Sequence, residues 1–514
     1  MNVHLDWKLA RRLRQAVQIL FFGFFIILLF IGLQRQTVFP LADFFFRINP
    51  LSAQTSMLAA RAWIPRLGWA LVVVGLTVLV GRVWCGWICP FGTLLEWVSF
   101  KKARQRARAI SPRWRTVKYV LLVVILVGAL FGNLSLLVFE PLALFTRAMT
   151  AVVIPALNYA VSTSESTLYS LAFLRPAISW LETVLRGPVL PVVQPVFGSS
   201  YLIAGLFFGL LALNLLADRF WCRYLCPLGG LLGWLSRFSL LRPLIGQTCT
   251  ACTRCALLCK PGAIKTVPAT PGSSREVEIM PAECTVCLDC LVECKKDSLA
   301  FGPVLKPAPA QEFDLSRRQF LQTAALGAAG IVLLNTNVRL RTKNSRLIRP
   351  PGVNDEQAFL SKCLRCSECM KVCPTNGLQP SQGEAGLEGW WTPNLMPRLG
   401  HCDYGCHACG QVCPSGAIPL LTLEQKRLAV IGTAVVNRNR CLPWASNTPC
   451  IVCEEMCPTP QKSIRLEEVS VTDQAGETVM LQRPYVLREL CIGCGICENH
   501  CPLAGDAAIQ IYRT

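Results

Sequence analysis

Long apolar runs alternate with basic segments over the first half of the chain. Four runs are apolar enough, and long enough, to be membrane-spanning helices: residues 16–33, 68–84, 119–139 and 201–217. Basic residues precede the first run and fill the segment between the second and third, whereas residues 140–200 contain only three arginines. The positive-inside rule therefore predicts a four-span helical bundle over residues 1–240, with both of its ends on the cytoplasmic side.

Composition supports a membrane protein. The 514 residues are 52% hydrophobic and only 16% charged, and the mean hydropathy is +0.42. The net charge of +20 could indicate a nucleic-acid partner, but the basic residues lie largely beside the apolar runs. We therefore interpret the charge as a topology signal and predict no nucleic-acid binding.

A second kind of signal lies in mid-chain, at residues 316–321. The string Ser-Arg-Arg-Gln-Phe-Leu precedes an apolar stretch over 322–334, and it resembles a twin-arginine export signal. About 14 apolar residues fall short of an ordinary span, so a buried or interfacial helix is the alternative. No Ala-x-Ala cleavage site follows, and we expect residues 314–336 to remain as a membrane anchor.

Cysteine is the most unusual feature of the composition, with 28 residues against four histidines. Residues 241–305 contain two runs with the spacing of bacterial ferredoxins, Cys249-Cys252-Cys255-Cys259 and Cys284-Cys287-Cys290-Cys294. In such runs the fourth cysteine ligates the other cluster, so Cys294 joins the first three and Cys259 joins the second three. Zinc is the alternative ligand, but it would leave the third and fourth cysteines of each run unexplained.

Residues 337–514 contain four further cysteine runs. They are Cys363-Cys366-Cys369-Cys373, Cys402-Cys406-Cys409-Cys413, Cys441-Cys450-Cys453-Cys457 and Cys491-Cys494-Cys497-Cys501. The middle two have a lengthened first gap, which indicates an inserted loop. A cytoplasmic two-cluster module and an exported four-cluster module, both of the α+β ferredoxin type, are therefore predicted, with six [4Fe-4S] clusters in all.

Two Cys-x-x-x-Cys-Pro motifs follow the second and fourth apolar runs. They contain Cys85 and Cys89, and Cys222 and Cys226. Their recurrence suggests an internal duplication of a two-span unit. One interpretation is a redox or metal element, even one shared four-thiolate site, and the other is structural thiols or disulfides. No histidine lies within the four apolar runs, so a bis-histidine haem held by these helices is not expected.

The motifs together carry a family resemblance. The signal-like string, Arg-Pro-Pro-Gly at 349–352 and Cys-Leu-Arg-Cys-Ser-Glu-Cys-Met-Lys-Val-Cys-Pro at 363–374 resemble NapG, an exported ferredoxin-type family of periplasmic nitrate reduction systems. Residues 1 to about 300 resemble its membrane partner family, NapH, so the whole chain is similar to a NapH–NapG fusion. The resemblance implies that the first and last of the four exported runs share their clusters, as do the middle two. Cys501 would then complete the site of Cys363, Cys366 and Cys369, and Cys373 would complete the site of Cys491, Cys494 and Cys497. Of the middle two runs, Cys457 would join Cys402, Cys406 and Cys409. Cys413 would join Cys441, Cys450 and Cys453.

These features predict a multi-pass protein of the bacterial inner membrane, with residues 241–305 cytoplasmic and 337–514 periplasmic. It would oxidise quinol from the membrane pool and pass electrons to a periplasmic reductase or c-type cytochrome. Glu140, after the third run, is the candidate ionisable group of a quinol site, with a solvated helix end as the alternative. The competing functions are an accessory factor that supplies electrons for maturation of a metalloenzyme, and a membrane anchor with passive clusters.

Overall fold

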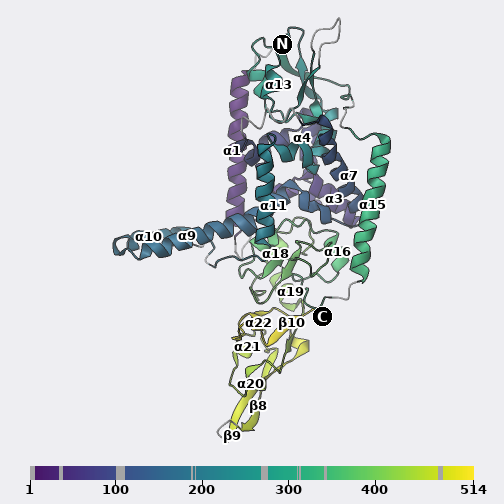
Figure 1. Ribbon diagram of the computed structural model, residues 1–514. Coiled ribbons are helices and arrows are strands. Elements are labelled where there is room, and N and C mark those ends of the chain that lie inside the picture. Colours follow the sequence, from purple (N-terminus) through teal and green to yellow (C-terminus); the bar gives the residue numbers. More distant parts are fainter. Residues whose placement is uncertain are drawn as a thin grey trace. The chain divides into compact units, whose positions relative to one another are not determined.

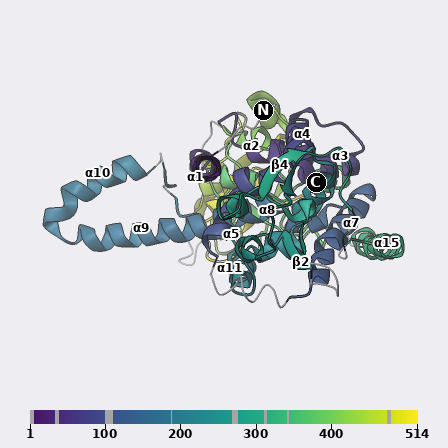
Figure 2. The ribbon, with the colours of Figure 1, turned by 90° about the horizontal axis from the view of Figure 1, so that it is seen from above.

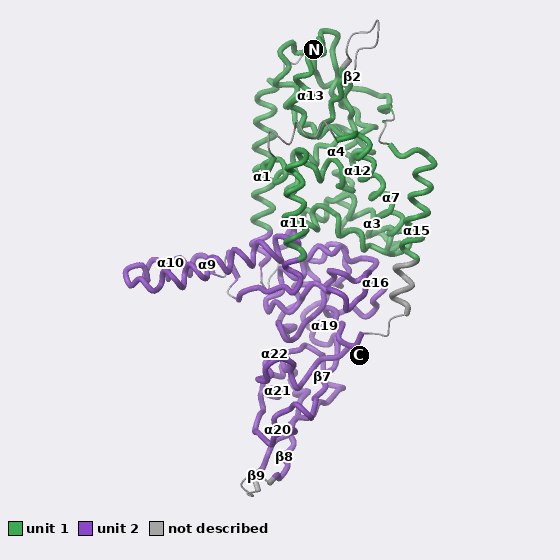
Figure 3. The backbone as a smooth tube through the Cα atoms, in the orientation of Figure 1, with its two compact units in different colours: residues 1–28, 44–145, 202–332 green, residues 29–43, 146–201, 333–514 purple. Residues whose placement is uncertain are grey.

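The computed structural model describes residues 6–33, 39–99, 110–186, 189–191, 193–267, 276–309, 311, 314–340, 344–472 and 478–513. The basic residues predicted to fill 101–108 lie outside these ranges. The chain forms two compact units (Figure 3). Unit 1 comprises residues 1–28, 44–145 and 202–332, and unit 2 comprises residues 29–43, 146–201 and 333–514. Unit 2 thus combines part of the predicted membrane domain with the predicted exported module.

Unit 1 is mainly helical (Figure 1). Its helices are α1 (Trp7–Ile31), α2 (Phe44–Arg47), α3 (Pro50–Ala60), α4 (Ala70–Val80), α5 (Pro90–Trp97), α7 (Thr116–Leu130), α8 (Pro141–Ala148), α11 (Ser200–Ala212), α12 (Pro227–Leu235) and α15 (Arg317–Leu340), of which α1, α8, α11 and α15 extend into unit 2 at one end. Stacked and tilted phenylalanines fill the interior, with the rings of Phe25, Phe91 and Phe207 grouped around Phe145. These rings bury a large apolar surface between helices that have few polar side chains to offer.

The predicted spans are only partly present as helices of spanning length. Among the described residues, two helical stretches are long and apolar enough to cross a membrane, Trp7–Ile31 and Pro141–Tyr169. The first coincides with the predicted run 16–33, whereas the second lies in a segment predicted to be a loop. The other three runs form helices α4, α7 and α11 of 11, 15 and 13 residues, or about 16–22 Å at 1.5 Å per residue. Helix lengths therefore do not confirm four ordinary spans of about 30 Å.

Glycine explains where two of these helices end. Gly81 follows α4 with φ +88° and Gly132 follows α7 with φ +76°, a left-handed conformation that favours glycine and stops a right-handed helix. Both glycines lie inside the apolar runs 68–84 and 119–139, where hydropathy alone indicates a continuous helix. The sequence pattern missed these breaks because it measures apolar length and not backbone conformation.

The predicted ferredoxin module of residues 241–305 is part of unit 1. Its strands β1 (Leu241–Ile245) and β4 (Leu299–Pro303) pair antiparallel, as do β2 (Ile264–Val267) and β3 (Glu276–Ile279). The short helices α13 (Arg254–Leu258) and α14 (Asp289–Val292) lie between the strands in sequence and contact each other. A small core of Val286, Leu288, Leu291 and Leu299 holds the module together.

Unit 2 contains the last four cysteine runs on short helices and two-stranded ribbons. Its elements are α9 (Ile154–Tyr169), α10 (Arg175–Leu185), α16 (Glu356–Leu360), α17 (Glu368–Lys371), β5 (Leu378–Pro380), β6 (Pro393–Leu395), α18 (Ala408–Gln411), α19 (Leu423–Leu428), β7 (Thr433–Val436), α20 (Leu442–Ala445), α21 (Val452–Glu455), β8 (Ile464–Thr472), β9 (Thr478–Val486), α22 (Ile496–Asn499) and β10 (Ile509–Tyr512). Antiparallel pairs join β5 to β6, β7 to β10 and β8 to β9.

Helices α9 and α10 form a hairpin (Figure 2), and its polar and apolar side chains have the reverse of the usual arrangement. Arg186 forms an ion pair with Glu165 and a 2.7 Å hydrogen bond to Asn158, and all three side chains are largely shielded from water. Large apolar side chains point outward instead, with Phe173 77% and Trp180 67% exposed. Polar groups inside and apolar groups outside are typical of a segment that contacts lipid or another protein.

The signal-like string begins a single 24-residue helix, α15. The Ser316 hydroxyl accepts a hydrogen bond from the backbone N–H of Gln319, and the Gln319 side chain accepts one from the N–H of Ser316. This reciprocal pair is a capping box, which satisfies backbone donors at the start of a helix. Two residues of the string therefore have a structural role, whether or not the string also directs export.

Candidate functional site

The regular cysteine runs share one local backbone design. In each of four runs, the residue before the second cysteine and the residue after it have positive φ: Ala251 and Thr253, Val286 and Leu288, Arg365 and Ser367, and Gly493 and Gly495. Alternating left-handed residues curl the chain and turn successive N–H groups toward the inside of the loop, which creates a concave, anion-binding nest. Because β-branched Val286 costs about 1–3 kcal/mol in this conformation, the curl is maintained against local strain.

The two runs of residues 241–305 form two sites that exchange their last cysteines. Cys249, Cys252, Cys255 and Cys294 line one hollow, and Cys259, Cys284, Cys287 and Cys290 line another. This is the grouping that the ferredoxin spacing predicts. The Sγ atom of Cys259 also accepts a hydrogen bond of 3.1 Å from the backbone N–H of Ala263, which favours a thiolate at that position.

The four runs of unit 2 pair as neighbours in sequence. Three hollows are lined by Cys363, Cys366, Cys369 and Cys413; by Cys402, Cys406, Cys409 and Cys373; and by Cys441, Cys450, Cys453 and Cys501. The four cysteines that remain in unit 2 are Cys457, Cys491, Cys494 and Cys497. Helix α21, which precedes Cys457, contacts α22, which contains Cys497. The pairing implied by the family resemblance, first run with last and middle with middle, was wrong.

Helix packing gives the physical reason for this pairing. Helix α17 of the first run contacts α18 of the second, and α21 of the third contacts α22 of the fourth. Val372, Ala408 and Val412 form a shared core between the first two runs. Ser463 links the last two, because its N–H donates to the Sγ of Cys457 at 3.3 Å and its hydroxyl donates to the Leu490 carbonyl at 2.6 Å. Each pair of runs is therefore one compact two-site unit.

These donor sets fit iron–sulfur clusters. Each hollow receives three cysteines from one run and the last from its partner, which is the ligand pattern of two-cluster ferredoxins. When bound, such clusters supply one-electron transfer without making or breaking substrate bonds. Within the described ranges, no three His, Cys, Asp or Glu side chains are grouped so as to hold a single metal ion.

The remaining four cysteines lie on two equivalent turns of unit 1. Trp84–Ile88 and Trp221–Leu225 are π-helical turns, η2 and η8, closed by hydrogen bonds from the N–H of Cys89 to the Trp84 carbonyl and from that of Cys226 to the Trp221 carbonyl. Pro90 and Pro227 then begin α5 and α12. Proline suits the first position of a helix, because the N–H that it lacks would have no partner within the helix there.

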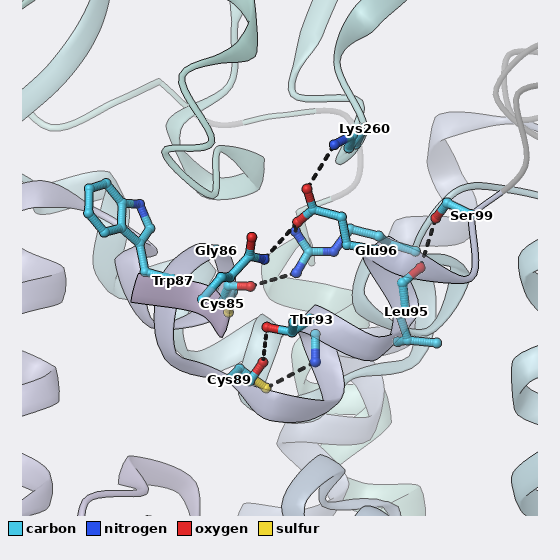
Figure 4. Close-up of polar contacts among 12 residues, drawn as sticks. Cys85, Gly86, Trp87, Cys89, Thr93, Leu95, Glu96, Ser99 and Lys260 are labelled. Carbon is cyan, nitrogen blue, oxygen red and sulfur yellow. Dashed lines mark hydrogen bonds and ion pairs between the residues drawn. The ribbon is translucent and has the colours of Figure 1, made fainter. Parts of the chain in front are cut away.

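Both second cysteines are helix N-caps. The Sγ of Cys89 accepts from the Gly92 N–H at 3.4 Å (Figure 4), and the Sγ of Cys226 accepts from the Gly229 N–H at 3.2 Å. Burial raises the pKa of Cys89, and the neighbouring thiols of Cys85 and Cys222 raise it further. Burial also raises the pKa of Cys226, and Cys222, Cys85 and Cys89 raise it further. Cys85, Cys89 and Cys226 are buried and Cys222 is partly exposed, so the two motifs bring the four thiols into one largely buried environment.

Two arginines of this site were missed in the sequence. Arg82 and Arg219 stand three residues before Cys85 and Cys222, and both are 1% exposed. Nη2 of Arg82 lies 3.9 Å from the Sγ of Cys85, and Nη2 of Arg219 donates to the Cys85 carbonyl at 2.5 Å. The sequence does contain a signal for these arginines, because both motifs have the extended pattern Arg-x-Trp-Cys-x-x-x-Cys-Pro.

Glu140 is buried at 1% exposure, so its interpretation as a solvated helix end was wrong. One carboxylate oxygen accepts from the Asn49 side-chain amide at 2.6 Å, and the other accepts from the Ala143 N–H at 2.6 Å. The second bond caps the start of α8. These contacts show how the carboxylate is held. A role for Glu140 in quinol oxidation is a separate proposal.

Comparison with family models identifies three iron–sulfur regions. A 4Fe-4S binding domain model matches residues 62–108 and 200–246, a 4Fe-4S dicluster domain model matches residues 353–418, and a second 4Fe-4S binding domain model matches residues 484–503. The dicluster match contains the first two runs of unit 2, which agrees with their pairing in the structure. No solved structure matches the chain.

Several ferredoxin-type proteins are similar to part of the chain. The methylamine utilization ferredoxin-type protein MauM of Methylorubrum extorquens is 34% identical over 206 residues, which is 38% of this chain and 88% of MauM. The ferredoxin-type protein NapG of Escherichia coli is 34% identical over 198 residues, or 37% of this chain and 83% of NapG. NapF of the same organism is 31% identical over 171 residues, or 33% of this chain and 89% of NapF. The chain therefore belongs to the ferredoxin-type family of NapG and MauM and is an iron–sulfur electron-transfer protein.

Proposed function

We propose that this protein is a membrane-bound quinol dehydrogenase that passes electrons through six [4Fe-4S] clusters to a periplasmic reductase or c-type cytochrome. The observation that carries the proposal is the series of six cysteine groups, each made of three cysteines of one run and one of its partner, of which five line a hollow in the described residues. Such a series favours relay of single electrons over chemistry on a bound substrate. On this proposal the chain is a NapH–NapG-like fusion, with residues 1 to about 300 as the membrane part.

Helix α1 supports the membrane location. Its outward side chains include Leu13, Leu20 and Ile27, each 55% or more exposed and spaced by seven residues along one stripe. A continuous apolar stripe of this kind on a 25-residue helix would be costly in water and is favourable in lipid. The exposed apolar face of the α9–α10 hairpin fits the same environment. Both support insertion in the bacterial inner membrane.

The proposed topology has two cytoplasmic clusters, held by residues 241–305, and four periplasmic clusters, held by residues 337–514. The signal-like helix α15 stands between these segments in the sequence. Export of a folded module is chemically reasonable, because metal binding and folding are coupled and the clusters are assembled before transport. Protease treatment of sealed vesicles tests this directly: cleavage of residues 344–513 only from the periplasmic face supports the topology, and cleavage from the cytoplasmic face contradicts it.

Glu140 is the proposed proton acceptor at the quinol site. Its burial beside Asn49 is compatible with a group that exchanges a proton with quinol, and also with a purely structural cap. Glu140→Gln keeps the length of the side chain and one acceptor oxygen but cannot accept that proton. If the proposal holds, the variant retains its full iron content and loses quinol-driven reduction; unchanged reduction would remove Glu140 from the site.

The experiment that tests the function is anaerobic reduction in proteoliposomes. A menaquinol analogue is added to the purified full chain, and bleaching of the cluster absorbance is followed with and without an artificial periplasmic acceptor. We expect reduction by quinol and turnover with the acceptor. Clusters that stay oxidised under excess quinol would contradict the proposal and favour the accessory function, in which the clusters supply electrons for assembly of a metalloenzyme.

A further inference from the structure

The four cysteines of the two Cys-x-x-x-Cys-Pro motifs have the properties of a built site. Cys85, Cys89 and Cys226 are 5–8% exposed. The guanidinium of each motif reaches the other motif: Nη2 of Arg82 lies 2.8 Å from the position of a Cβ on Gly229, and Nη2 of Arg219 lies 2.8 Å from that on Gly92. Both glycines are needed to admit these arginines, because a side chain would occupy the same space. The two motifs therefore interlock across a local pseudo-twofold.

Positive charge exceeds negative charge around these thiols. Glu96 is paired with Arg14, Arg219 and Lys260, and Glu283 is paired with Arg82 and Lys118. Lys260 also pairs with Asp289 at 3.5 Å, so five cations share three carboxylates. Four of the five cations are at most 2% exposed at the side chain. Buried cations are costly unless an anion compensates them. Thiolates are the compensating anions that this site can supply.

The positions of the two arginines favour thiolates over neutral thiols. Nη2 of Arg82 lies 3.9 Å from the Sγ of Cys85, and each guanidinium lies against the turn that carries the second cysteine of the other motif. Metal coordination deprotonates cysteine outright. Cys89 and Cys226 are in addition N-caps of helices α5 and α12, a position that stabilises the thiolate form. A four-thiolate iron–sulfur centre satisfies both the thiols and the arginines.

We propose that Cys85, Cys89, Cys222 and Cys226 together hold a seventh iron–sulfur centre, which exchanges single electrons with the site of Cys259, Cys284, Cys287 and Cys290. The matched 4Fe-4S binding domain segments, 62–108 and 200–246, contain these four cysteines and no others. One electron enters and one leaves, and no covalent bond changes. The inference extends the proposed electron path, but the existence of the site does not depend on quinol as the donor.

Direct contacts join the two sites within unit 1. Nη1 of Arg82 donates to the Ala282 carbonyl at 2.8 Å and lies 3.5 Å from Glu283, which precedes Cys284. The indole N–H of Trp87, inside the first motif, donates to the Val286 carbonyl at 3.0 Å, next to Cys287. The loop that carries two cysteines of the neighbouring site therefore lies against the first motif.

The second motif contacts the other part of the same site. Nη2 of Arg223, which follows Cys222, lies against the position that a Cβ on Gly262 would occupy. Arg115 donates to the Gly262 carbonyl at 2.8 Å, in the turn that follows Cys259. Both motifs thus approach the site of Cys259 and Cys284, each from its own side. A short protein path of this kind is what one-electron exchange between two centres requires.

Iron and acid-labile sulfide of the anaerobically purified full chain test the proposal, compared with Cys85→Ser/Cys222→Ser. Seven centres of four irons correspond to about 28 iron atoms, and six correspond to about 24. We expect the wild type to contain about 28 and the double variant about 24, with the 24 ferredoxin-run cysteines still protected from alkylation. The matched control Cys252→Ser removes an exposed ligand of a ferredoxin run and leaves Cys85, Cys89, Cys222 and Cys226 protected.

Two further measurements test the proposal even if the double variant does not accumulate in the cell. Mass mapping of the wild type under non-reducing conditions shows whether the four cysteines are metal-protected, freely alkylated or joined as disulfides. About 24 irons with alkylated or disulfide-bonded motif cysteines overturns the seventh centre, whatever the electron donor. The paired ferredoxin sites give spin–spin splitting in the EPR spectrum of both reduced proteins. An additional splitting in the wild type that is lost from the variant supports exchange with the neighbouring site, and identical spectra overturn that coupling.

Discussion

The carbonyl oxygen of Thr285 lies against Gly86 at the point where a side chain on that glycine would begin. Gly86 is inside the π-helical turn between Cys85 and Cys89, and Thr285 lies between Cys284 and Cys287 of a ferredoxin run. Two cysteine motifs that are about 200 residues apart in sequence therefore touch backbone to backbone. The glycine makes that approach possible, since any Cβ would overlap the carbonyl.

Gly86→Ala is expected to separate these two motifs. Overpacking against a fixed backbone costs about 1–3 kcal/mol, and we expect a lower temperature for thermal loss of cluster absorbance. Gly75→Ala is the matched control, because a Cβ there meets no atom within 4 Å and alanine is a better helix former than glycine. Equal melting temperatures for Gly86→Ala and the wild type would contradict the contact.

The neighbour pairing of cysteine runs in unit 2 predicts a specific pattern of exposed thiols. In Cys413→Ser we expect Cys363, Cys366 and Cys369 to become reactive to an alkylating agent under native, anaerobic conditions, because their shared cluster loses a ligand. Cys441, Cys450 and Cys453 should stay protected in this variant and become reactive in Cys501→Ser instead. The reverse pattern would support the pairing of first run with last. Peptide mass mapping measures both variants.

Arg349, of the Arg-Pro-Pro-Gly string, is expected to stabilise unit 2. It is 2% exposed, forms an ion pair with Glu356, donates to the Pro393 carbonyl at 2.6 Å and lies over the Phe359 ring at 4.7 Å. Arg349→Ala removes these contacts, although Arg513 still pairs with Glu356 at 3.4 Å, and it should cost about 1–3 kcal/mol. Arg346→Ala is the control, since the Arg346 side chain is 40% exposed in its ion pair with Glu498 and such pairs contribute about 0–1 kcal/mol. Equal denaturation midpoints in urea for the two variants would show that the contacts of Arg349 stabilise unit 2 no more than the exposed ion pair of Arg346 does.

Glu96 predicts a pH dependence of stability in unit 1. Burial alone would raise the pKa of Glu96, but Arg219, Lys260 and Arg14 outweigh it and hold the value far below its ordinary 4.5. A carboxyl whose pKa is lowered by folding contributes stability above its unfolded value and loses it as the pH falls through the range below about 4.5. Glu96→Gln should therefore be less stable than the wild type at pH 7, and the difference should narrow as the pH falls below 4.5.

Thermal unfolding of both proteins across this range measures the effect, because any acid lability of clusters is common to them and cancels in the difference. Glu182→Gln, in helix α10 of unit 2, is the control for loss of one carboxylate. A wild-type advantage that stays constant from neutral to acid pH would show that Glu96 is not held ionised by its neighbours.

The cysteine spacing was sufficient to predict the sites of residues 241–305, because two identical runs leave one symmetric way to exchange a ligand. It was not sufficient in unit 2, where four similar runs allow several pairings. The choice there is made by helix contacts, such as that of Val372 with Val412, which spacing does not encode. Hydropathy likewise located helix α1 but could not show the breaks at Gly81 and Gly132, which are set by backbone conformation.

The contact between the two Cys-x-x-x-Cys-Pro motifs could be predicted only in part from the sequence. The repeated Arg-x-Trp before each motif could be read from the sequence, and it marks Arg82 and Arg219 as equivalent. That each arginine inserts beside the glycine of the other motif depends on three-dimensional packing. The sequence thus showed that the two motifs are equivalent, and the structure showed that they contact each other.

The central claim is that the cysteine runs hold iron–sulfur clusters. Its most direct test is the iron, acid-labile sulfide and zinc content of the full chain, purified without oxygen. We predict at least about 24 iron atoms per chain, an equal amount of sulfide and no stoichiometric zinc. A preparation that contains zinc and lacks sulfide would contradict the account.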